Sequence, residues 1–180
     1  VVSLAKNLGY VPKSITAPKA VVDLELTFTG GTPPTSVTLT AGSGFVSNYD
    51  GSLYRFVVTE DTKVSVANNV ASFTNLSIYE GSYLTTNTTI DASLKNQRFI
   101  IENTGVDTNT VKVRVFTSAG SSVYDDYAVA SNILDIGAND KVFFISEQED
   151  ENYEIFFGDG VLGKKLEDGN VVQISYIVTN

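Results

Sequence analysis

The sequence predicts an all-β protein, with antiparallel or mixed strands in a sandwich-like arrangement after a short N-terminal helix. Three observations support this fold class. Apolar and polar residues alternate with a period of two along much of the chain, as in strands with one buried face. Charged residues make up only 18% of the 180 residues, and the many Thr, Ser, Asn and Gly residues favour strands and turns. No amphipathic helical pattern continues beyond the first residues.

The first nine residues, VVSLAKNLG, predict the last turns of a helix. Val1, Leu4 and Leu8 keep helical spacing, and the glycine that follows them is suited to end a helix. Residues 1–18 are therefore expected to form the end of a helix and a connecting loop. Because the chain contains no Met and starts within this pattern, we expect it to be a fragment of a longer chain.

Residues 19–180 are expected to form a single β-rich domain, or two lobes of about 19–95 and 96–180. In the first part, KAVVDLELTF (19–28) alternates strictly, and turns such as GGTPP (30–34) separate the strands that follow. The long Thr- and Ser-rich stretch from residue 70 to residue 90 contributes four candidate core residues, Phe73, Leu76, Ile78 and Tyr83.

The second part continues the strand pattern. In NTVKVRVF (109–116), the three valines face one way and the basic residues face the other. The segments KVFFISEQ and YEIFFGDG predict two strands on either side of an acidic stretch. Their phenylalanines are expected to form a cross-strand core cluster of Phe143, Phe144, Phe156 and Phe157. Residues 121–140 are irregular and allow one helical turn near Asp126.

Charge and missing residue types argue against several classes of function. The formal net charge is −9 and the pI is near 4.4, so nucleic acids and anionic membrane surfaces are poor partners. Without Cys or His there is no thiolate chemistry and no Ser-His-Asp triad, and the commonest transition-metal ligands are missing. No apolar run approaches the about 20 residues that a membrane-spanning helix needs. We therefore expect no catalytic residues, cofactor or metal.

The stretch FFGDGVLGKK (156–165) contains most of a phosphate-binding P-loop. Gly158, Gly163 and Lys164 match the G-x-x-x-x-G-K spacing, but Lys165 stands where a hydroxyl should bind magnesium. A strand pattern follows the motif, whereas phosphate binding needs the N-terminus of a helix. The glycines are better explained as residues that permit positive φ in a loop between two strands.

Carboxylates offer two candidate catalytic groups. Asp125 with Asp126 could be a glycosidase pair, and so could Asp159 with Glu167 or Asp168. Acidic loop residues on a soluble surface explain the same pattern more simply. For Asp159 we expect a structural role, in which its carboxylate accepts hydrogen bonds from loop N–H groups.

Two further features leave binding functions open. The acidic stretch EQEDEN (147–152) lacks the ligand order of an EF-hand loop, so a solvated hairpin tip is expected there, with loose calcium binding as the alternative. Tyr49, Tyr54 and Tyr79 could line a sugar-binding face, although half-buried strand positions explain most such tyrosines.

The C-terminal stretch YEIFFGDGVLGKKLEDGNVVQISYIVTN resembles a signature of the baseplate J-like family of contractile bacteriophage tails. There a strand leads into a Phe-Gly-Asp-Gly loop, a second glycine with a basic residue, a glycine turn, and a strand ending in Tyr-x-x-Thr. The matching residues here are Phe157, Gly158, Asp159, Gly160, Gly163, Lys164, Gly169, Tyr176 and Thr179. The segment 8–26 is similar to the start of the family's middle domain, and 100–116 resembles the long wedge subunit of large myophages.

This resemblance implies a structural role as the middle domain of a baseplate wedge subunit. Other wedge subunits would be its partners, together with a second copy that pairs through regions partly outside this chain. Its place would be the tail baseplate of the virion, assembled in the host cytoplasm. The alternative is a receptor- or glycan-binding β module of a tail fibre or adhesin.

Overall fold

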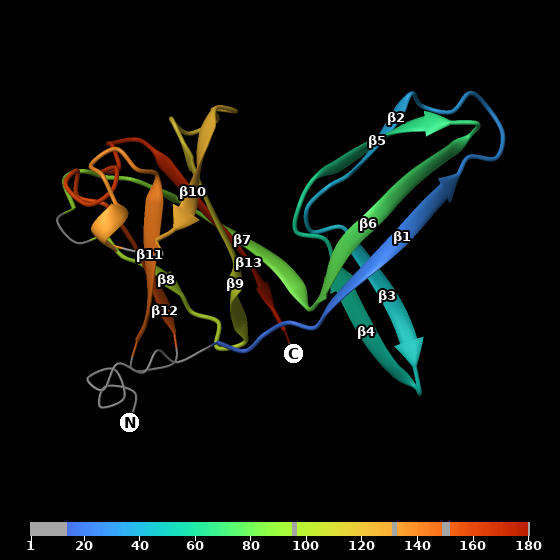
Figure 1. Ribbon diagram of the computed structural model, residues 1–180, viewed down its shortest axis with the longest axis horizontal. Coiled ribbons are helices and arrows are strands. Elements are labelled where there is room, and N and C mark those ends of the chain that lie inside the picture. The colour runs from blue at the N-terminus through green and yellow to red at the C-terminus, as the bar shows by residue number, and fades with distance from the viewer. Residues whose placement is uncertain (1–13, 95–96, 131–132, 149–151, 180) are drawn as a thin grey trace.

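The computed structural model describes residues 14–94, 97–130, 133–148 and 152–179, and it confirms the all-β class. Thirteen strands in these ranges form two sheets that lie side by side along the long axis of the molecule (Figure 1). The helix predicted for the first nine residues lies outside the described ranges. Within those ranges, no helix has the length and apolar character needed to cross a membrane.

The first sheet has a long central strand, β6 (Val70–Glu80). On one side β6 pairs with β1 over most of its length, and on the other side it pairs with β5 at its start and with β4 at its end. The predicted core residues Phe73, Leu76 and Ile78 are buried. The other strands are β1 (Lys19–Thr27), β2 (Ser36–Leu39), β3 (Gly44–Tyr49), β4 (Ser52–Val57) and β5 (Thr62–Ala67).

A bulge in β6 interrupts its pairing with β1. The register shifts between Val22 and Leu24, and Asn75 on the facing strand adopts a positive φ of 55°. Asp23 stabilises this conformation, because its carboxylate accepts a hydrogen bond of 2.8 Å from the Asn75 N–H. A bulge bends the strand and increases its local twist.

The second sheet is mixed and has the strand order β7-β13-β9-β10-β11-β12-β8. Its pairs are antiparallel except β10 and β11, which run parallel. A single 3-10 turn at Ile133–Asp135 connects these two strands. The helical turn considered near Asp126 is therefore wrongly placed, because Asp126 lies in β10 opposite Arg114. The strands are β7 (Ser82–Thr89), β8 (Phe99–Ile101), β9 (Val106–Phe116), β10 (Tyr124–Val129), β11 (Val142–Glu147), β12 (Tyr153–Phe157) and β13 (Val171–Val178).

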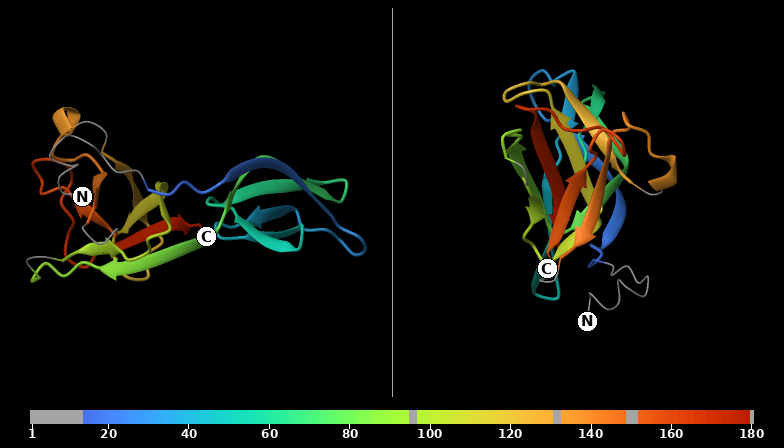
Figure 2. Two further views of the ribbon diagram at one scale, coloured as in Figure 1. Left: turned by 90° about the horizontal axis from the view of Figure 1, so that it is seen from below. Right: turned by 90° about the vertical axis from the view of Figure 1, so that its left-hand side faces the viewer.

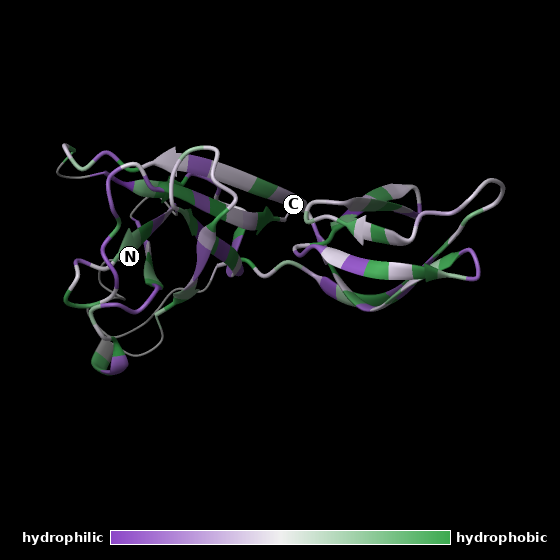
Figure 3. Cartoon of the chain, turned by 90° about the horizontal axis from the view of Figure 1, so that it is seen from above, coloured by the Kyte–Doolittle hydropathy of each residue, from purple (hydrophilic) through white to green (hydrophobic). Residues whose placement is uncertain are grey.

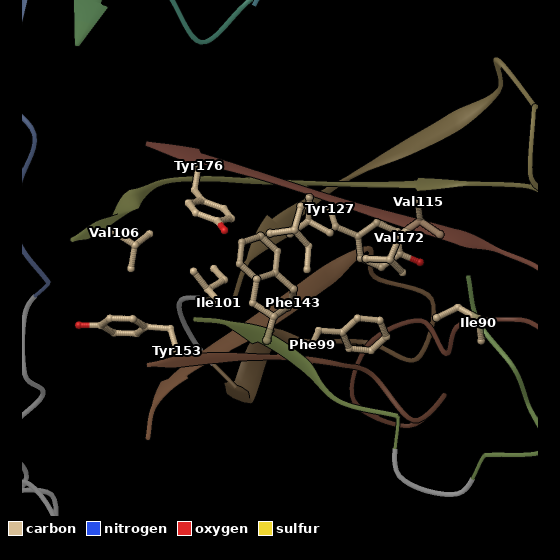
Figure 4. Close-up of a cluster of buried hydrophobic side chains, with 13 residues drawn as sticks. Ile90, Phe99, Ile101, Val106, Val115, Tyr127, Phe143, Tyr153, Val172 and Tyr176 are labelled. Carbon is tan, nitrogen blue, oxygen red and sulfur yellow. The ribbon is translucent and has the colours of Figure 1, made fainter. Parts of the chain in front are cut away.

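This second sheet curves around the main hydrophobic core, where side chains from most of its strands meet (Figure 4). Figure 3 shows the apolar and polar bands that alternate along its strands. The four phenylalanines of the predicted core cluster do pair across β11 and β12, Phe143 with Phe157 and Phe144 with Phe156, but the predicted cluster is wrong for the second pair. Only the first pair contacts the core. Phe156 is 42% exposed, because alternation turns it to the outer face.

The chain passes from the first sheet to the second through one residue, Gly81. A small apolar group, which we call the junction cluster, surrounds this point. It contains Ala17, Val57, Tyr79, Tyr83 and Ile177, and three of these, Ala17, Val57 and Ile177, are buried. The division into lobes at about residue 95 remains a prediction, whereas the change of sheet occurs at Gly81.

Asp107 fixes a second connection between the two sheets. This residue is only 2% exposed, and its carboxylate accepts hydrogen bonds from the Ala17 N–H at 2.9 Å and from Asn109 at 3.0 Å. Buried carboxylates are tolerated when such donors satisfy them. The segment that leads into β1 is therefore anchored to β9 of the second sheet.

We predict that Gly81→Ala destabilises the protein far more than Gly120→Ala. Both glycines have positive φ, but a Cβ at Gly81 would overlap the backbone carbonyl of Val178, whereas one at Gly120 meets nothing within 4 Å. We expect a loss of about 1 kcal/mol for the control and at least about 3 kcal/mol for Gly81→Ala. Urea unfolding curves measure the difference, and equal midpoints for the two variants would contradict it.

Candidate functional site

The predicted motif forms a loop, residues 158–165, between β12 and the turn that precedes β13; we call it the glycine loop. Phe157 ends β12 and anchors the loop to the core. Its ring meets Phe99 edge-on at a centroid distance of 5.2 Å, and Tyr127 at 5.7 Å. Such edge-to-face contacts add to the stabilisation from burial, so the start of the loop is held in place.

Two glycines allow the loop to close on itself. A Cβ at Gly158 would overlap the backbone of Gly163, and one at Gly163 would come within 2.9 Å of the Val142 side chain. Gly163 also has a φ of 86° and Gly160 a φ of 91°, and residues other than glycine rarely adopt such positive values. The Gly160 N–H donates to the Gly163 carbonyl at 3.0 Å. The spacing of glycines thus follows from close backbone approach.

Asp159 organises the tip of the glycine loop, as expected. Its carboxylate oxygen Oδ1 accepts hydrogen bonds from the Val161 N–H at 2.8 Å and the Leu162 N–H at 3.0 Å. These two donors, Leu162 first, hold the pKa of the Asp159 carboxyl below its usual value. The folded loop therefore stabilises the ionised form of this carboxylate.

Lys164 connects the glycine loop to the neighbouring strands. Its backbone N–H donates to the Asp140 carbonyl at 2.7 Å, and its ammonium lies 3.4 Å from Asp125 on β10. Lys141 reaches the other oxygen of Asp125 at 2.7 Å. The hydrogen bond from Lys141 is the main cause that lowers the pKa of Asp125, and Lys164 adds to it.

Gly169 and Tyr176 lie away from the glycine loop. Gly169 has a φ of 80° in the turn before β13, and its N–H donates to the Ile90 carbonyl at 3.0 Å. Tyr176 is buried in the core, where its hydroxyl accepts a hydrogen bond of 2.9 Å from the Asn103 side chain. The structure brings together the motif residues from Phe157 to Lys164, whereas the last two stabilise other parts of the same sheet.

The glycine loop differs from a phosphate-binding P-loop in the use of its N–H groups. Those of Val161 and Leu162 donate to Asp159, and those of Gly160, Gly163 and Lys164 donate to backbone carbonyls. A P-loop offers such groups to phosphate at the start of a helix. Here a turn and strand β13 follow instead.

Four of the five carboxylates considered for a glycosidase pair, Asp125, Asp126, Asp159 and Asp168, have structural partners. Asp125 binds two lysines and Asp126 binds Arg114, while Asp168 accepts a hydrogen bond from the Ala92 N–H. A general acid in a glycosidase needs a raised pKa. The pKa values of Asp125 and Asp159 are lowered instead, so these two groups are poorly suited to donate a proton.

The three candidate tyrosines do not share one face. Tyr54 lies opposite Ser47 on the β3–β4 hairpin, and Tyr49 follows on the same face at the hairpin tip, where it is 75% exposed. Tyr79 is opposite Val57, and alternation along β4 places Val57 and Tyr54 on opposite faces. Tyr79 belongs to the junction cluster. Only two of the three are available to one ligand.

The acidic stretch 147–152 is only partly described, because residues 149–151 lie outside the described ranges. Gln148 and Asn152 close the hairpin between β11 and β12 with an N–H to carbonyl hydrogen bond of 2.8 Å. Across the part of the chain that the structure describes, no group of three or more His, Cys, Asp or Glu residues could hold a metal ion. Calcium binding by the whole stretch stays a hypothesis.

Sequence reasoning missed the structural role of Asp107 and the pairing of Asp125 with two lysines. A carboxylate between valine and threonines in a strand-like segment was a usable signal for Asp107, because a charge there must be exposed or satisfied by donors. The lysines of Asp125 are 16 and 39 residues away in sequence, and no local pattern indicates such contacts.

The second half of the chain matches a known protein family. Residues 85–179 match the model of the family described as "Bacteriophage baseplate wedge protein gp6, third domain". The matched region is just over half of the chain. It begins within β7 and ends after β13, so it covers the second sheet except for residues 82–84, and it includes the glycine loop. A comparison with curated proteins found no match.

We predict that Asp159→Ala lowers the melting temperature at pH 7, because two loop N–H groups lose their acceptor. The pKa of Asp159 is lowered in the folded protein, so its stabilising effect is complete above the unfolded pKa of about 3.9 and is lost as the pH falls further. Thermal melts between pH 7 and pH 2 should therefore show the wild type and this variant converging in acid.

Asp159→Asn is the matched control for this prediction. Its amide oxygen can still accept hydrogen bonds but carries no charge, so we expect a smaller loss at pH 7 and no contribution from this side chain to the pH dependence. Identical melting temperatures for wild type and Asp159→Ala at neutral pH would show that the carboxylate does not stabilise the loop.

Proposed function

The chain belongs to the family of the bacteriophage baseplate wedge protein gp6, and from this premise we propose that it is a structural domain that joins neighbouring subunits of a baseplate wedge. Its general role is thus that of a structural component of a phage tail baseplate. The observation that carries the proposal is the family match over residues 85–179, which includes the whole glycine loop.

We further propose that the domain helps to build the ring of wedges around the tail hub and supports assembly and contraction of the sheath. Its partners would be other wedge subunits and a second copy of the same chain, with assembly in the host cytoplasm. The motif from Phe157 to Thr179 supports the additional kinship with the baseplate J-like family. In this role the domain moves as a unit when the baseplate changes shape.

The geometry of the site agrees with a structural role. Asp159, Lys164 and Asp125 are engaged in hydrogen bonds and ion pairs that hold the glycine loop against β10 and the segment before β11. At the other end of the molecule, the β3–β4 hairpin exposes Val46 and Leu53 by 62% and 72%. Exposed apolar side chains on a rigid scaffold suit contacts with other proteins.

A glycan-binding module of a tail fibre is the second candidate function. The observation that favours it is the face of the β3–β4 hairpin that carries Tyr49 and Tyr54, since exposed tyrosine rings can stack on sugars. Tyr79 would not take part, because it lies on the opposite face of that sheet.

Immunogold electron microscopy of intact phage particles tests this proposal, with an antibody raised against the purified chain. We expect label in a ring at the distal plate of the tail, around the hub. Label at fibre tips would contradict the wedge role and favour the glycan-binding module. In that case a glycan array comparing wild type with Tyr49→Ala, and with Tyr124→Ala as the exposed control, is the next measurement.

A further inference from the structure

Strand β7 is an edge strand with one free side. It pairs with β13 over all eight of its residues without a register shift. On its other side, no strand pairs with it among the described residues. Figure 2 shows β7 along the margin of the second sheet, next to β13.

The hydrogen-bonding pattern shows which backbone groups of β7 face outward. The Ile90 N–H donates to the Asn170 carbonyl, just beyond the last pair of the ladder. Antiparallel ladders alternate, so Thr88, Thr86 and Leu84 bond to β13, and the N–H and carbonyl groups of Thr85 and Asn87 point away from it. Gln97 confirms this direction, since its side chain donates to the Thr89 carbonyl at 2.7 Å.

Both ends of this outer edge are covered. Gln97 occupies the end at Thr89, and at the other end Tyr83 packs in the junction cluster beside β4. Between them, Thr85, Thr86 and Asn87 are exposed, and Leu84 is 37% exposed. Leu84 and Thr86 lie opposite the buried Tyr176 and Ile174. Their side chains therefore belong to the core face but reach its open margin.

The outer edge of β7 lacks the features that prevent an edge strand from pairing with a strand of another molecule. Natural edges carry charged residues, proline or bulges, or they are very short. β1 has three charged residues and faces a bulge, β2 has four residues and β8 has three. The edge strand β3 is also uncharged, but it is shorter, with six residues, and begins with a glycine. In contrast, β7 reads SYLTTNTT, with no charge, proline, glycine or bulge over eight residues.

We infer that β7 pairs with β7 of a second copy of this chain, antiparallel and centred on Thr86. The net charge of −9 opposes contact between two copies, and the uncharged edge of β7 is a place where they meet without facing carboxylates. A partner with another sequence could carry basic residues that are attracted to this acidic chain, and it would not require β7 to be uncharged. Self-pairing therefore explains the composition of the strand.

The side chains of β7 fit this register. Outward-facing Thr85 pairs with Asn87 of the second copy, and the two exchange N–H to carbonyl hydrogen bonds on each side of the two-fold axis. On the core face, Thr86 meets Thr86 of the second copy, and Leu84 meets its Thr88. Cross-strand threonine pairs and apolar contacts of this kind each contribute about 0.2–1 kcal/mol.

The pairing would join two seven-stranded sheets into one continuous sheet. The contact is small compared with stable interfaces, which bury about 1,200–2,000 Å² in total, so isolated chains should associate weakly. Repetition around a ring would strengthen it through effective concentration. This inference deepens the self-association proposed above and rests on the wedge role for its biological meaning.

Cysteine cross-linking tests the register, because the natural chain contains no Cys. In a Thr86→Cys variant, the two cysteines would face each other at a Cα separation of about 4.5 Å, which a disulfide can span. We expect a disulfide-linked dimer on non-reducing gels after mild oxidation of the whole chain. In Thr88→Cys the two cysteines would lie about 13 Å apart, so linkage should be at least tenfold slower.

A proline variant separates strand pairing from random collision. Asn87→Pro in the Thr86→Cys background removes an outward N–H and leaves the ladder to β13 intact, so linkage should fall at least tenfold. Asn87→Ala is its matched control, since it loses the same side-chain hydrogen bond to Gln173 but keeps the N–H and should still link. Circular dichroism establishes that each variant is folded.

Equal linkage rates for Thr86→Cys and Thr88→Cys, or no effect of the proline, would overturn the pairing. Absence of any dimer at millimolar concentration would overturn it as well. Neither result bears on the wedge role, which the position of the immunogold label decides separately. If label marks the tail plate while β7 fails to link, the structural function stands and only this surface is rejected.

Discussion

The arrangement of the two sheets depends on the close backbone contact at Gly81. There the chain leaves β6 and enters β7 within one residue, and its Cα lies so close to the Val178 carbonyl that no side chain fits. The Gly81 N–H donates to the Arg55 carbonyl, and the Glu80 N–H donates to the Pro18 carbonyl. These two hydrogen bonds join the connection between β6 and β7 to β4 and to the segment before β1.

Other contacts around this point limit rotation of one sheet against the other. The junction cluster places the fully buried Val57 and Ile177 together. Asp107 holds the segment before β1, and Lys112 reaches across from β9 to Glu60 at 2.7 Å. These contacts are an apolar cluster, a hydrogen-bonded side chain and an ion pair, so salt weakens mainly the ion pair and leaves the other two in place.

A close backbone contact that only glycine permits, like the one at Gly81, also occurs in the glycine loop. There the backbones of Gly158 and Gly163 approach too closely for a side chain, and Asp159 and Asp125 satisfy N–H groups and ammonium groups around the contact. Aspartates, which are catalytic groups in many other proteins, here stabilise the conformation of the loop backbone. This accounts for a motif that resembles a P-loop in sequence while its donors are already engaged.

The sequence by itself determined the fold class, most strand positions and much of the core. Strict alternation predicts that Val113 and Val115 are buried, and the glycine spacing predicts a loop between strands. Only the tertiary structure decided that Gly81 joins the sheets, that Asp107 is buried, and that Phe156 faces outward. Such outcomes depend on partners far along the chain, as Ala17 is from Asp107. Local periodicity reports which face is apolar, whereas register and contact between sheets come from the packing of distant segments.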